Sequence, residues 1–287
     1  MTDPAPTLSP KLASDLKVRA ISGFVLILIA AVELYMGGTF FVIFVAAMAA
    51  GMIWEALDLT GVQRVAPRLL AMGLCALGLL AMIPALPNQG FPVWVALLLM
   101  AGTLLVAWGA STRKRAFPMG MVAAASVCLA CLTMVLSELR ADFYTIPPLL
   151  LLVPAVIGTD IGAYFTGRLV GGPKLAPRVS PNKTWSGAIG GVVSAIILGL
   201  VTIYLFHGDL VPHSELEMVL MLAGLSVCSQ IGDLVESWLK RRAGRKDSGN
   251  LIPGHGGLLD RFDWFLGASL LGLGPWLLYQ EFGGMVP

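Results

Sequence analysis

Charged residues are scarce in this sequence of 287 residues: aspartate, glutamate, lysine and arginine together make up only 13% of it. Soluble domains carry about 25%. Hydrophobic residues make up 57%, glycine adds 33 residues, and the mean hydropathy is +0.82. This composition excludes an ordinary soluble enzyme, a disordered protein and a coiled coil, and it indicates an integral membrane protein. The net charge of +2 gives no sign of nucleic-acid binding.

Long apolar runs recur along the chain, and each is close to the roughly 20 residues that a helix needs to cross a membrane. A transmembrane barrel would show alternating segments of about 10 residues instead. We therefore predict an all-α polytopic membrane protein with about nine transmembrane helices. The predicted spans are about Ala20–Met36, Thr39–Leu57, Leu69–Leu86, Val93–Ala110, Phe117–Ser137, Pro148–Thr166, Ala188–Phe206, Met218–Val235 and Trp264–Gln280.

The basic residues predict the orientation of these helices. With a cytoplasmic N-terminus, all of the 19 lysines and arginines except Arg140 fall on the cytoplasmic side, as the positive-inside rule requires. We expect two regions. Residues 1–146 form an N-terminal transmembrane region of about five helices with a structural, lipid-facing role. Residues 147–287 form a catalytic region of about four helices with two basic cytoplasmic loops.

Small residues inside the spans fit close helix packing. Gly158 and Gly162 have the four-residue spacing typical of tight helix contacts, although a crowded site beside Asp160 is an alternative. Cys128 and Cys131 have C-x-x-C spacing, but no histidine or polar partner is near, so we interpret them as packing residues. All of the cysteines lie inside predicted spans, namely Cys75, Cys128, Cys131 and Cys228.

Acidic residues differ between the two halves. Glu33 and Glu55 lie near span ends in the N-terminal half, where an interfacial position explains them. Asp160 lies well inside an apolar run, where an aspartate costs on the order of 3 kcal/mol on insertion scales. It therefore needs a polar cavity and a partner. The other acids that converge on the cytoplasmic boundary are Asp233, Asp260 and Asp263. Oxygen ligands of this kind suit Mg²⁺, Mn²⁺ or Ca²⁺ rather than zinc.

Two cytoplasmic segments, residues 171–187 and 237–263, interleave basic residues with glycine, proline and polar residues, and the second also with histidine and aspartate. Topology alone explains basic loops but not this mixture. Glycine lets a ligand approach the backbone, lysine and arginine contact phosphate oxygens, and carboxylates hold a metal ion that bridges those oxygens. Together these features predict phosphoryl or nucleotidyl transfer. No G-x-x-x-x-G-K-[ST] motif occurs, so the site is not a P-loop.

The second segment contains a long pattern, Ser237-x-Leu-Lys-Arg-x4-Lys-Asp-x-Gly-x2-Ile-Pro-x-His-Gly-Gly-Leu-x-Asp-Arg-Phe-Asp263. This pattern resembles the signature of phosphatidate cytidylyltransferases, also called CDP-diglyceride synthases, and it meets every defined position. Ser180-Pro-Asn-Lys-Thr-Trp185 and Gly232-Asp-Leu-x-Glu-Ser237 also resemble the family. The first of these usually continues with an acidic residue, whereas Ser186 stands here. The similarity covers roughly residues 160 to 263.

The resemblance implies a reaction in which CTP and phosphatidate give CDP-diacylglycerol and pyrophosphate, a step of phospholipid biosynthesis. It implies dependence on Mg²⁺, with a monovalent cation such as K⁺ able to share the metal centre. The expected partners are CTP, phosphatidate and membrane lipid, with no nucleic acid and with a second copy of the chain in a homodimer. The expected location is the bacterial cytoplasmic (inner) membrane, with the active site facing the cytoplasm.

The resemblance and the residue chemistry together assign roles in a direct in-line attack on the α-phosphorus of CTP. The predicted metal ligands are Asp233, Asp260, Asp263 and Asp160. The predicted catalytic residues are Asp233, Asp260, Lys183, Lys240, Arg241, Lys246, His255 and Arg261. The predicted substrate-binding residues are Ser180, Asn182, Lys183, Thr184, Ser237, Gly256 and Gly257. Glu236 fits a helix cap or a structural partner equally well.

Two other classes of function are open from the sequence. A related enzyme that uses CTP on another lipid, such as a polyprenol kinase or an archaeal ether-lipid cytidylyltransferase, differs in its substrate or its products. A cation transporter would use Asp160 and Asp233 as an ion path. The complete signature argues against the first class. The position of the acids beside basic loops, and the lack of two matched halves, argue against the second.

The predicted orientation places a reporter protein fused after Ser111 in the cytoplasm, because residues 113 to 115 are basic and follow the fourth span on that side. A reporter that is active only in the cytoplasm should be active in this fusion. A matched fusion after Ala141 should be inactive, because it lies on the opposite side. An external reporter after Ser111 would contradict the nine-span topology.

Overall fold

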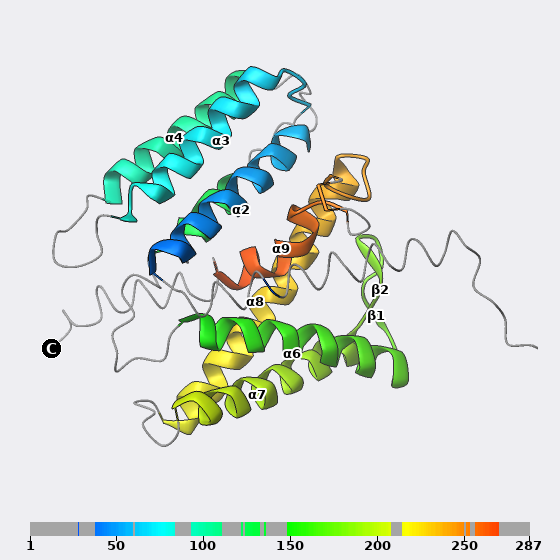
Figure 1. The fold of residues 1–287 in the computed structure, drawn as a ribbon. Coiled ribbons are helices and arrows are strands. Elements are labelled where there is room, and N and C mark those ends of the chain that lie inside the picture. Colours follow the sequence, from blue (N-terminus) through cyan, green and yellow to red (C-terminus); the bar gives the residue numbers. More distant parts are fainter. Residues whose placement is uncertain are drawn as a thin grey trace, which may run out of the picture.

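The computed structural model is built from long helices (Figure 1). It describes residues 28, 38–59, 61–83, 93–110, 122, 124–132, 135, 148–207, 214–249, 251–252 and 256–269. The helices are α2 (Gly38–Leu59), α3 (Val65–Leu80), α4 (Val93–Ala110), α6 (Pro148–Leu169), α7 (Trp185–His207), α8 (Glu215–Arg242) and α9 (Leu259–Gly267). Helices α2, α3 and α4 lie side by side, α6 packs on α7, and α8 contacts both α6 and α7 as well as α9.

The described residues of the predicted spans are helical except at the end of the third span, where α3 stops at Leu80 and residues 81–82 form a turn. Among the described residues, three helices are long and apolar enough to cross a membrane, namely Thr39–Leu59, Trp185–Phe206 and Glu215–Arg242. Val65–Leu80 and Val95–Ala110 are shorter apolar helices. Almost all of the first predicted span, and parts of the third, the fifth and the last, lie outside the described residues. The number of nine spans and the cytoplasmic N-terminus therefore stay predictions.

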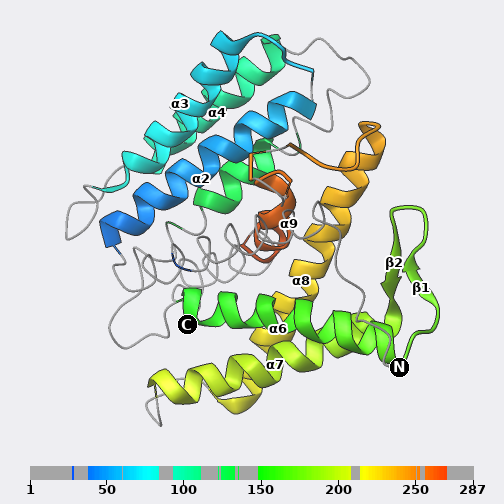
Figure 2. The ribbon, with the colours of Figure 1, turned by 45° about the vertical axis from the view of Figure 1, so that its right-hand side comes forward.

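One element differs from the all-α prediction. The strands β1 (Lys174–Ala176) and β2 (Ser180–Thr184) form a two-stranded antiparallel hairpin, which stands beside the end of α6 in Figure 2. Gly171 and Gly172 have φ angles of 66° and 105° and turn the chain out of α6, a conformation that favours glycine. The polar, proline-containing sequence has no apolar alternation to indicate a strand, so the sequence predicts only a loop here.

Glycines set the separation of α6 and α7, which confirms the expected close packing. A Cβ atom at Gly158 would lie 2.7 Å from the carbonyl oxygen of Ser194 and 2.8 Å from the Cα atom of Ala195. Gly162 is also closed off by Ser194. Because the atoms facing Gly158 belong to the backbone, no side chain can rotate away to make room. The two helices therefore touch through their backbones.

Helix α8 is longer than a bilayer core requires. Its 28 residues span about 42 Å at 1.5 Å per residue, compared with about 30 Å of hydrocarbon. A capping box fixes its start: the Ser214 hydroxyl accepts from the Glu217 N–H at 3.3 Å, and the Glu217 carboxylate accepts from the Ser214 N–H at 3.0 Å. Its last turn is basic. The extra length leaves the final turns of α8 for polar residues.

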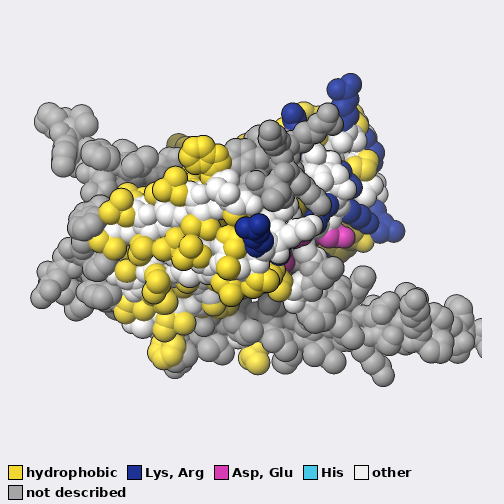
Figure 3. Space-filling view, turned by 90° about the horizontal axis from the view of Figure 1, so that it is seen from above, with side chains coloured by type: hydrophobic (Ala, Val, Ile, Leu, Met, Phe, Trp, Pro, Cys, Tyr) yellow, Lys and Arg dark blue, Asp and Glu magenta, His cyan; other side chains and the backbone are white. Residues whose placement is uncertain are grey.

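Basic and apolar side chains are separated on the surface. In Figure 3 the lysines and arginines gather mainly at one end of the visible face, and hydrophobic side chains cover much of the rest. Helix α7 exposes an apolar stripe with a four-residue spacing, formed by Ile189, Val193, Ile197 and Val201. Such a stripe is typical of a helix face that meets lipid or another apolar surface. This division matches the apolar spans and basic segments predicted from the sequence.

Gly158→Ala should lower the free energy of unfolding by about 1–3 kcal/mol, because the new methyl group meets fixed backbone atoms. The matched control is Gly224→Ala in α8, where an added Cβ atom finds no described atom within 4 Å. The control should be neutral or stabilising, since alanine favours a helix over glycine by about 1 kcal/mol. Thermal unfolding in detergent micelles measures both variants. Equal Tm values would contradict the close contact of α6 and α7.

Candidate active site

A polar cavity of about 530 Å³ lies between α6, the hairpin, α7, α8 and α9. The polar and aromatic residues that line it are Thr159, Asp160, Tyr164, Arg168, Asn182, Lys183, Thr184, Ser229, Gln230, Asp233 and Trp264. Segments that are far apart in the sequence therefore meet in one hollow. Five predicted site residues are among them, and they supply two carboxylates, one ammonium group and two neutral polar groups.

The closest contact in this cavity joins Lys183 and Asp233. The Lys183 ammonium group donates directly to Oδ2 of Asp233, and the Ser237 hydroxyl donates to Oδ1 of the same carboxylate at 3.4 Å. Asp160 interacts electrostatically with both Asp233 and Lys183. Asp160 thus has the polar cavity and the cationic neighbour that the sequence leads one to expect for an acid inside an apolar run.

Side-chain hydrogen bonds hold the helices around the cavity. Thr159, which precedes Asp160, donates to the Ser226 hydroxyl at 2.6 Å and joins α6 to α8. Gln230 donates through Nε2 to the carbonyl oxygen of Ala188 at 3.2 Å and joins α8 to α7. Thr159 is adjacent to Asp160, and Gln230 precedes Asp233 by three residues. Both side chains belong to the cavity wall. The positions of Asp160 and Asp233 are therefore fixed relative to each other by bonds between their helices.

The turn from β2 into α7 carries its own cap. The Thr184 hydroxyl accepts from the Gly187 N–H at 3.1 Å, as an N-cap residue does. Ser186, where the resemblance leads one to expect an acid, donates through its hydroxyl to the carbonyl oxygen of Gly171. These bonds hold β2, and with it Lys183, against the start of α7. Thr184 has this structural role in addition to its place in the cavity wall.

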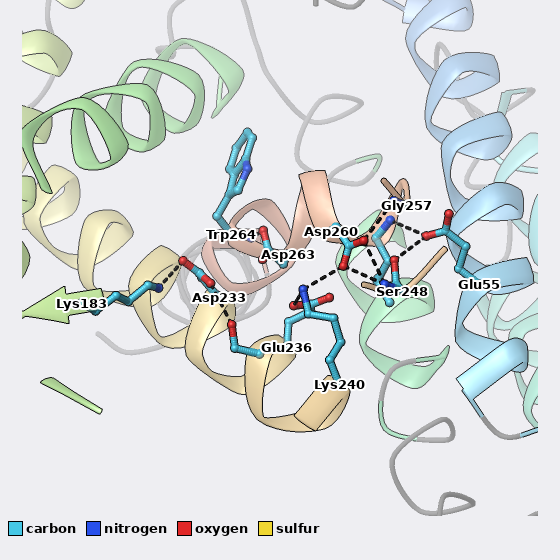
Figure 4. Close-up of polar contacts among 12 residues, drawn as sticks. Glu55, Lys183, Asp233, Glu236, Lys240, Ser248, Gly257, Asp260, Asp263 and Trp264 are labelled. Atoms are coloured by element: carbon cyan, nitrogen blue, oxygen red, sulfur yellow. Dashed lines mark hydrogen bonds and ion pairs between the residues drawn. The ribbon is translucent and has the colours of Figure 1, made fainter. Parts of the chain in front are cut away.

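Helix α9 brings Asp263 close to Asp233. A Cβ atom at Gly232 would lie 2.6 Å from the Cα atom of Gly267, so α8 and α9 touch through their backbones. Asp233 follows Gly232 directly and faces the helix that carries Asp263 (Figure 4). Burial, and then the Asp233 carboxylate, raise the pKa of Asp263 to about 7. Asp263 keeps its proton more readily than an ordinary carboxyl group because the site already holds negative charge.

The trio Asp160, Asp233 and Asp263 offers the oxygen donors that Mg²⁺ prefers. Asp233 interacts unfavourably with each of the other two carboxylates, and the cavity wall carries two cations, Lys183 and Arg168, for these three acids. Within the described residues, no three histidine, cysteine, aspartate or glutamate side chains are gathered closely enough to hold a metal ion. The donor chemistry and the charge fit a hard cation, while the individual ligands stay predictions.

Asp260 belongs to a different set of contacts. Its Oδ1 accepts from the Lys240 ammonium group at 2.8 Å and from the Ser248 N–H at 3.0 Å. Its Oδ2 accepts from the Ser248 N–H at 2.9 Å and from the Gly257 N–H at 3.0 Å. Burial raises the pKa of Asp260, but the bonds from Lys240 and the backbone outweigh burial and keep the pKa below its ordinary value. Direct ligation of a metal would have to share these oxygens with their present donors.

Lys240 is the counter-ion of two carboxylates. Its ammonium group lies 2.5 Å from Oε2 of Glu236 and 2.8 Å from Oδ1 of Asp260. Glu236 is only 5% exposed, and its oxygens lack a hydrogen bond of good geometry among the described residues. The ion pair with Lys240 offsets only part of the cost of burying Glu236, because removing both charges from water opposes the attraction between them. This arrangement favours the structural interpretation of Glu236 and gives Lys240 a role that the sequence did not predict.

The remaining predicted residues lie outside the cavity wall as the structure describes it. Arg241, Lys246 and Arg261 are exposed, and Ser180 is half-buried in β2. Gly256 has a φ of 87°, which favours glycine, and Gly257 packs tightly against Ser248 and the Glu55 carboxylate. His255 lies outside the described residues. The phosphate-binding and nucleotide-binding roles of these residues stay predictions.

Glu55 is a residue that the sequence interpretation missed. It is expected at the interface but is only 1% exposed, and it accepts hydrogen bonds from residues of the second basic segment. The donors are the Ser248 hydroxyl at 2.8 Å, the Leu258 N–H at 2.9 Å and the Leu259 N–H at 2.8 Å. The sequence offered one sign of this role: Glu55 and Asp58 are two acids one helical turn apart, with no basic residue beside them in α2.

Comparisons with known proteins identify the family of the chain. A family model described as the cytidylyltransferase family matches residues 17–271. The chain belongs to the cytidylyltransferase family. A phosphatidate cytidylyltransferase of Brucella suis biovar 1 (strain 1330) is 40% identical over 262 residues, which cover 90% of this chain and 92% of that protein. A phosphatidate cytidylyltransferase of Bacillus subtilis (strain 168) is 34% identical over 268 residues, with 88% and 94% covered.

Family membership confirms the resemblance seen in the second basic segment. It also extends beyond residues 160 to 263, because the family match begins at residue 17 and the long alignments cover both halves of the chain. The N-terminal helices are therefore part of what this family shares. This agrees with the contacts that α2 makes to the second basic segment.

Lys240→Met should lower the free energy of unfolding by about 3 kcal/mol or more, because it leaves Glu236 and Asp260 buried without their cation. The matched control is Arg241→Met, which removes the exposed charge next to it and should change stability by less than about 0.5 kcal/mol. Unfolding in detergent micelles without substrate measures both. If the two variants unfold alike, Lys240 is not the counter-ion of these carboxylates.

Proposed function

We propose that this protein is a phosphatidate cytidylyltransferase, which converts CTP and phosphatidate into CDP-diacylglycerol and pyrophosphate. The observation that carries the proposal is the cavity in which Lys183 and Asn182 face Asp233 and Asp160. It occurs in a chain of the cytidylyltransferase family whose relatives, aligned over most of their length, bear that name. A pocket with both cationic and anionic groups suits a reaction in which two polyanions and a metal ion must meet.

In the proposed reaction a phosphate oxygen of phosphatidate attacks the α-phosphorus of CTP in line. A new phosphorus–oxygen bond forms, and the bond to the bridging oxygen breaks, so that its electron pair leaves with pyrophosphate. A phosphate monoester is already a nucleophile at neutral pH, so the protein needs no general base. Its main task is to hold two negatively charged substrates together in the reactive geometry.

The residues of the cavity divide this task. Lys183 exchanges its contact with Asp233 for a phosphate oxygen, while Asn182 and Ser237 offer hydrogen bonds to phosphate. Asp233, with Asp160 and Asp263, would hold Mg²⁺, which supplies neutralisation of phosphate charge when it is bound; K⁺ is proposed as an accompanying ion. Asp260 shapes the segment that carries Asp263. Among the exposed cations, Arg241, Lys246 and Arg261 would draw the anionic substrates towards the site.

We further propose that the active site faces the cytoplasm, in a homodimer in the cytoplasmic membrane with nine spans and a cytoplasmic N-terminus. The gathering of basic side chains at one end of the molecule supports this orientation (Figure 3), as does the positive-inside distribution of the sequence. The diacyl chains of phosphatidate would stay among the helices while its phosphate reaches Lys183 and Asn182.

An assay of the purified protein with CTP, phosphatidate and Mg²⁺ tests the function. Pyrophosphate and CDP-lipid should appear in equal amounts, whereas release of CDP would identify a kinase instead.

Asp233→Asn should lower turnover on the order of 10²-fold or more, because it removes charge where the metal and phosphates meet. Lys183→Ala should raise KM, lower kcat, or both. The control Glu215→Gln, an exposed acid at the far end of α8, should keep wild-type turnover; equal activity in Asp233→Asn would contradict the assignment.

A further inference from the structure

We propose that Glu55 is a positioning residue for the reaction: from α2 it holds residues 248–259, and through them the acidic face of α9, in the geometry that metal and phosphate binding require. The inference rests on the proposed function, because it concerns how that site is organised. Nothing in the residue pattern of the catalytic half indicates a dependence on α2. The evidence for this dependence is the set of contacts between the Glu55 carboxylate and residues 248–259.

The Glu55 carboxylate binds the first N–H groups of α9. Oε1 accepts from Leu258 at 2.9 Å and Oε2 accepts from Leu259 at 2.8 Å. The first N–H groups of a helix have no partner inside the helix, and a negative charge at that end is favoured by the helix dipole. Glu55 thus anchors α9 at its N-terminal end, directly before Asp260.

Ser248 connects Glu55 to Asp260. Its hydroxyl donates to Oε2 of Glu55 at 2.8 Å, while its N–H donates to both oxygens of Asp260 at 3.0 and 2.9 Å. Ser248 is completely buried, and Figure 4 shows it between the two carboxylates. A shift of Glu55 would therefore displace Ser248, and Asp260 would lose one of the two backbone donors that orient it.

Two glycines leave the space that Glu55 occupies. A Cβ atom at Gly249 would lie 2.6 Å from Oε1 of Glu55, and one at Gly257 would lie 2.6 Å from Oε2. Gly249 lies outside the positive-φ region, so alanine is compatible with its backbone and only the carboxylate stands in the way. The segment is thus shaped around Glu55 on two sides.

Asp58 connects α2 to the same segment through a second contact. One turn after Glu55, it pairs with Arg245 through Oδ2 and with Arg68 through Oδ1, the latter at 2.5 Å. Arg245 lies just before Ser248, so α2 holds the segment at its start as well as at its end. The two acids together connect the N-terminal helices to the loop that carries the predicted catalytic residues.

Loss of Glu55 should have a different effect from loss of an ordinary buried residue, which lowers stability alone. Glu55→Gln keeps the size of the side chain but replaces one of the two accepting oxygens by an N–H₂ group that faces N–H donors, so the loop loses part of its anchor and the negative charge at the start of α9. Asp263 lies one turn beyond Asp260 on the same helix. A loosened α9 would therefore shift the Asp263 carboxylate relative to Asp233. We therefore expect metal dependence to change more than overall stability.

The experiment compares Glu55→Gln, Gly249→Ala and the double variant with Ile53→Val, a control that trims a completely buried side chain of the same helix. The readouts are the Mg²⁺ concentration for half-maximal turnover, KM and kcat for CTP, and amide hydrogen exchange over residues 248–259. Glu55→Gln should raise the half-maximal Mg²⁺ concentration at least ten-fold and speed exchange in this segment. The double variant should be little worse than the more impaired single variant, because both disturb one contact. Ile53→Val should lower Tm and leave all three readouts unchanged.

Each possible result either supports or contradicts the proposed role of Glu55. Unchanged metal dependence and exchange in Glu55→Gln, or equal shifts in Ile53→Val, would overturn it. If Glu55→Gln does not fold, Ser248→Ala removes one of the three hydrogen bonds and should give a smaller shift in the same direction; no shift would overturn the inference. If the wild type forms no CDP-lipid, the proposed function fails, and hydrogen exchange alone still decides whether Glu55 orders residues 248–259.

Discussion

A carboxylate withdrawn from water needs donors or a cation, and this requirement arranges the polar part of the protein. Glu55 meets backbone and hydroxyl donors, Asp260 meets Lys240 and two backbone N–H groups, and Glu236 shares Lys240. At the cavity, Lys183 and Arg168 share the wall with the acids of α6 and α8, and Asp263 on α9 interacts unfavourably with Asp233. This concentration of carboxylates and cations suits the recruitment of a metal ion together with phosphates.

These groups form a row across the molecule, in which the backbone of α8 itself makes the step from Asp233 to Glu236. It begins with Lys183 on the hairpin, passes to Asp233 on α8, and continues one turn later with Glu236 and Lys240. From Lys240 it reaches Asp260 on α9, then Ser248, and ends at Glu55 on α2 (Figure 4). Helix α8 is the element common to both ends, and its length beyond the apolar core gives room for these polar turns. The hairpin, the last loop and the N-terminal helices are thus joined through polar contacts as well as by packing.

The sequence predicted those parts that depend on local composition. Apolar runs located the helices, because insertion depends on segment hydrophobicity, and the intramembrane Asp160 pointed to a polar cavity, because such a residue needs a partner. The hairpin was missed because its strands pair through the backbone and lack an apolar alternation. Ser248 was missed because it falls at an undefined position of the motif. The division between the Asp233 and Asp260 sets was missed as well, because spacing alone cannot tell which face of α9 meets α8.

The bond between Glu55 and Ser248 joins residues that are 193 positions apart. The chain is made from its N-terminus, so α2 exists long before the loop that completes its partner set. During that interval the acidic side chain of α2 has none of its three donors, and α9 has no anchor for its first turn. The order of synthesis therefore makes residues 248–259 the closing piece of this contact set. A chain that stops before residue 259 leaves the Glu55 carboxylate without the full set of donors that compensates its burial.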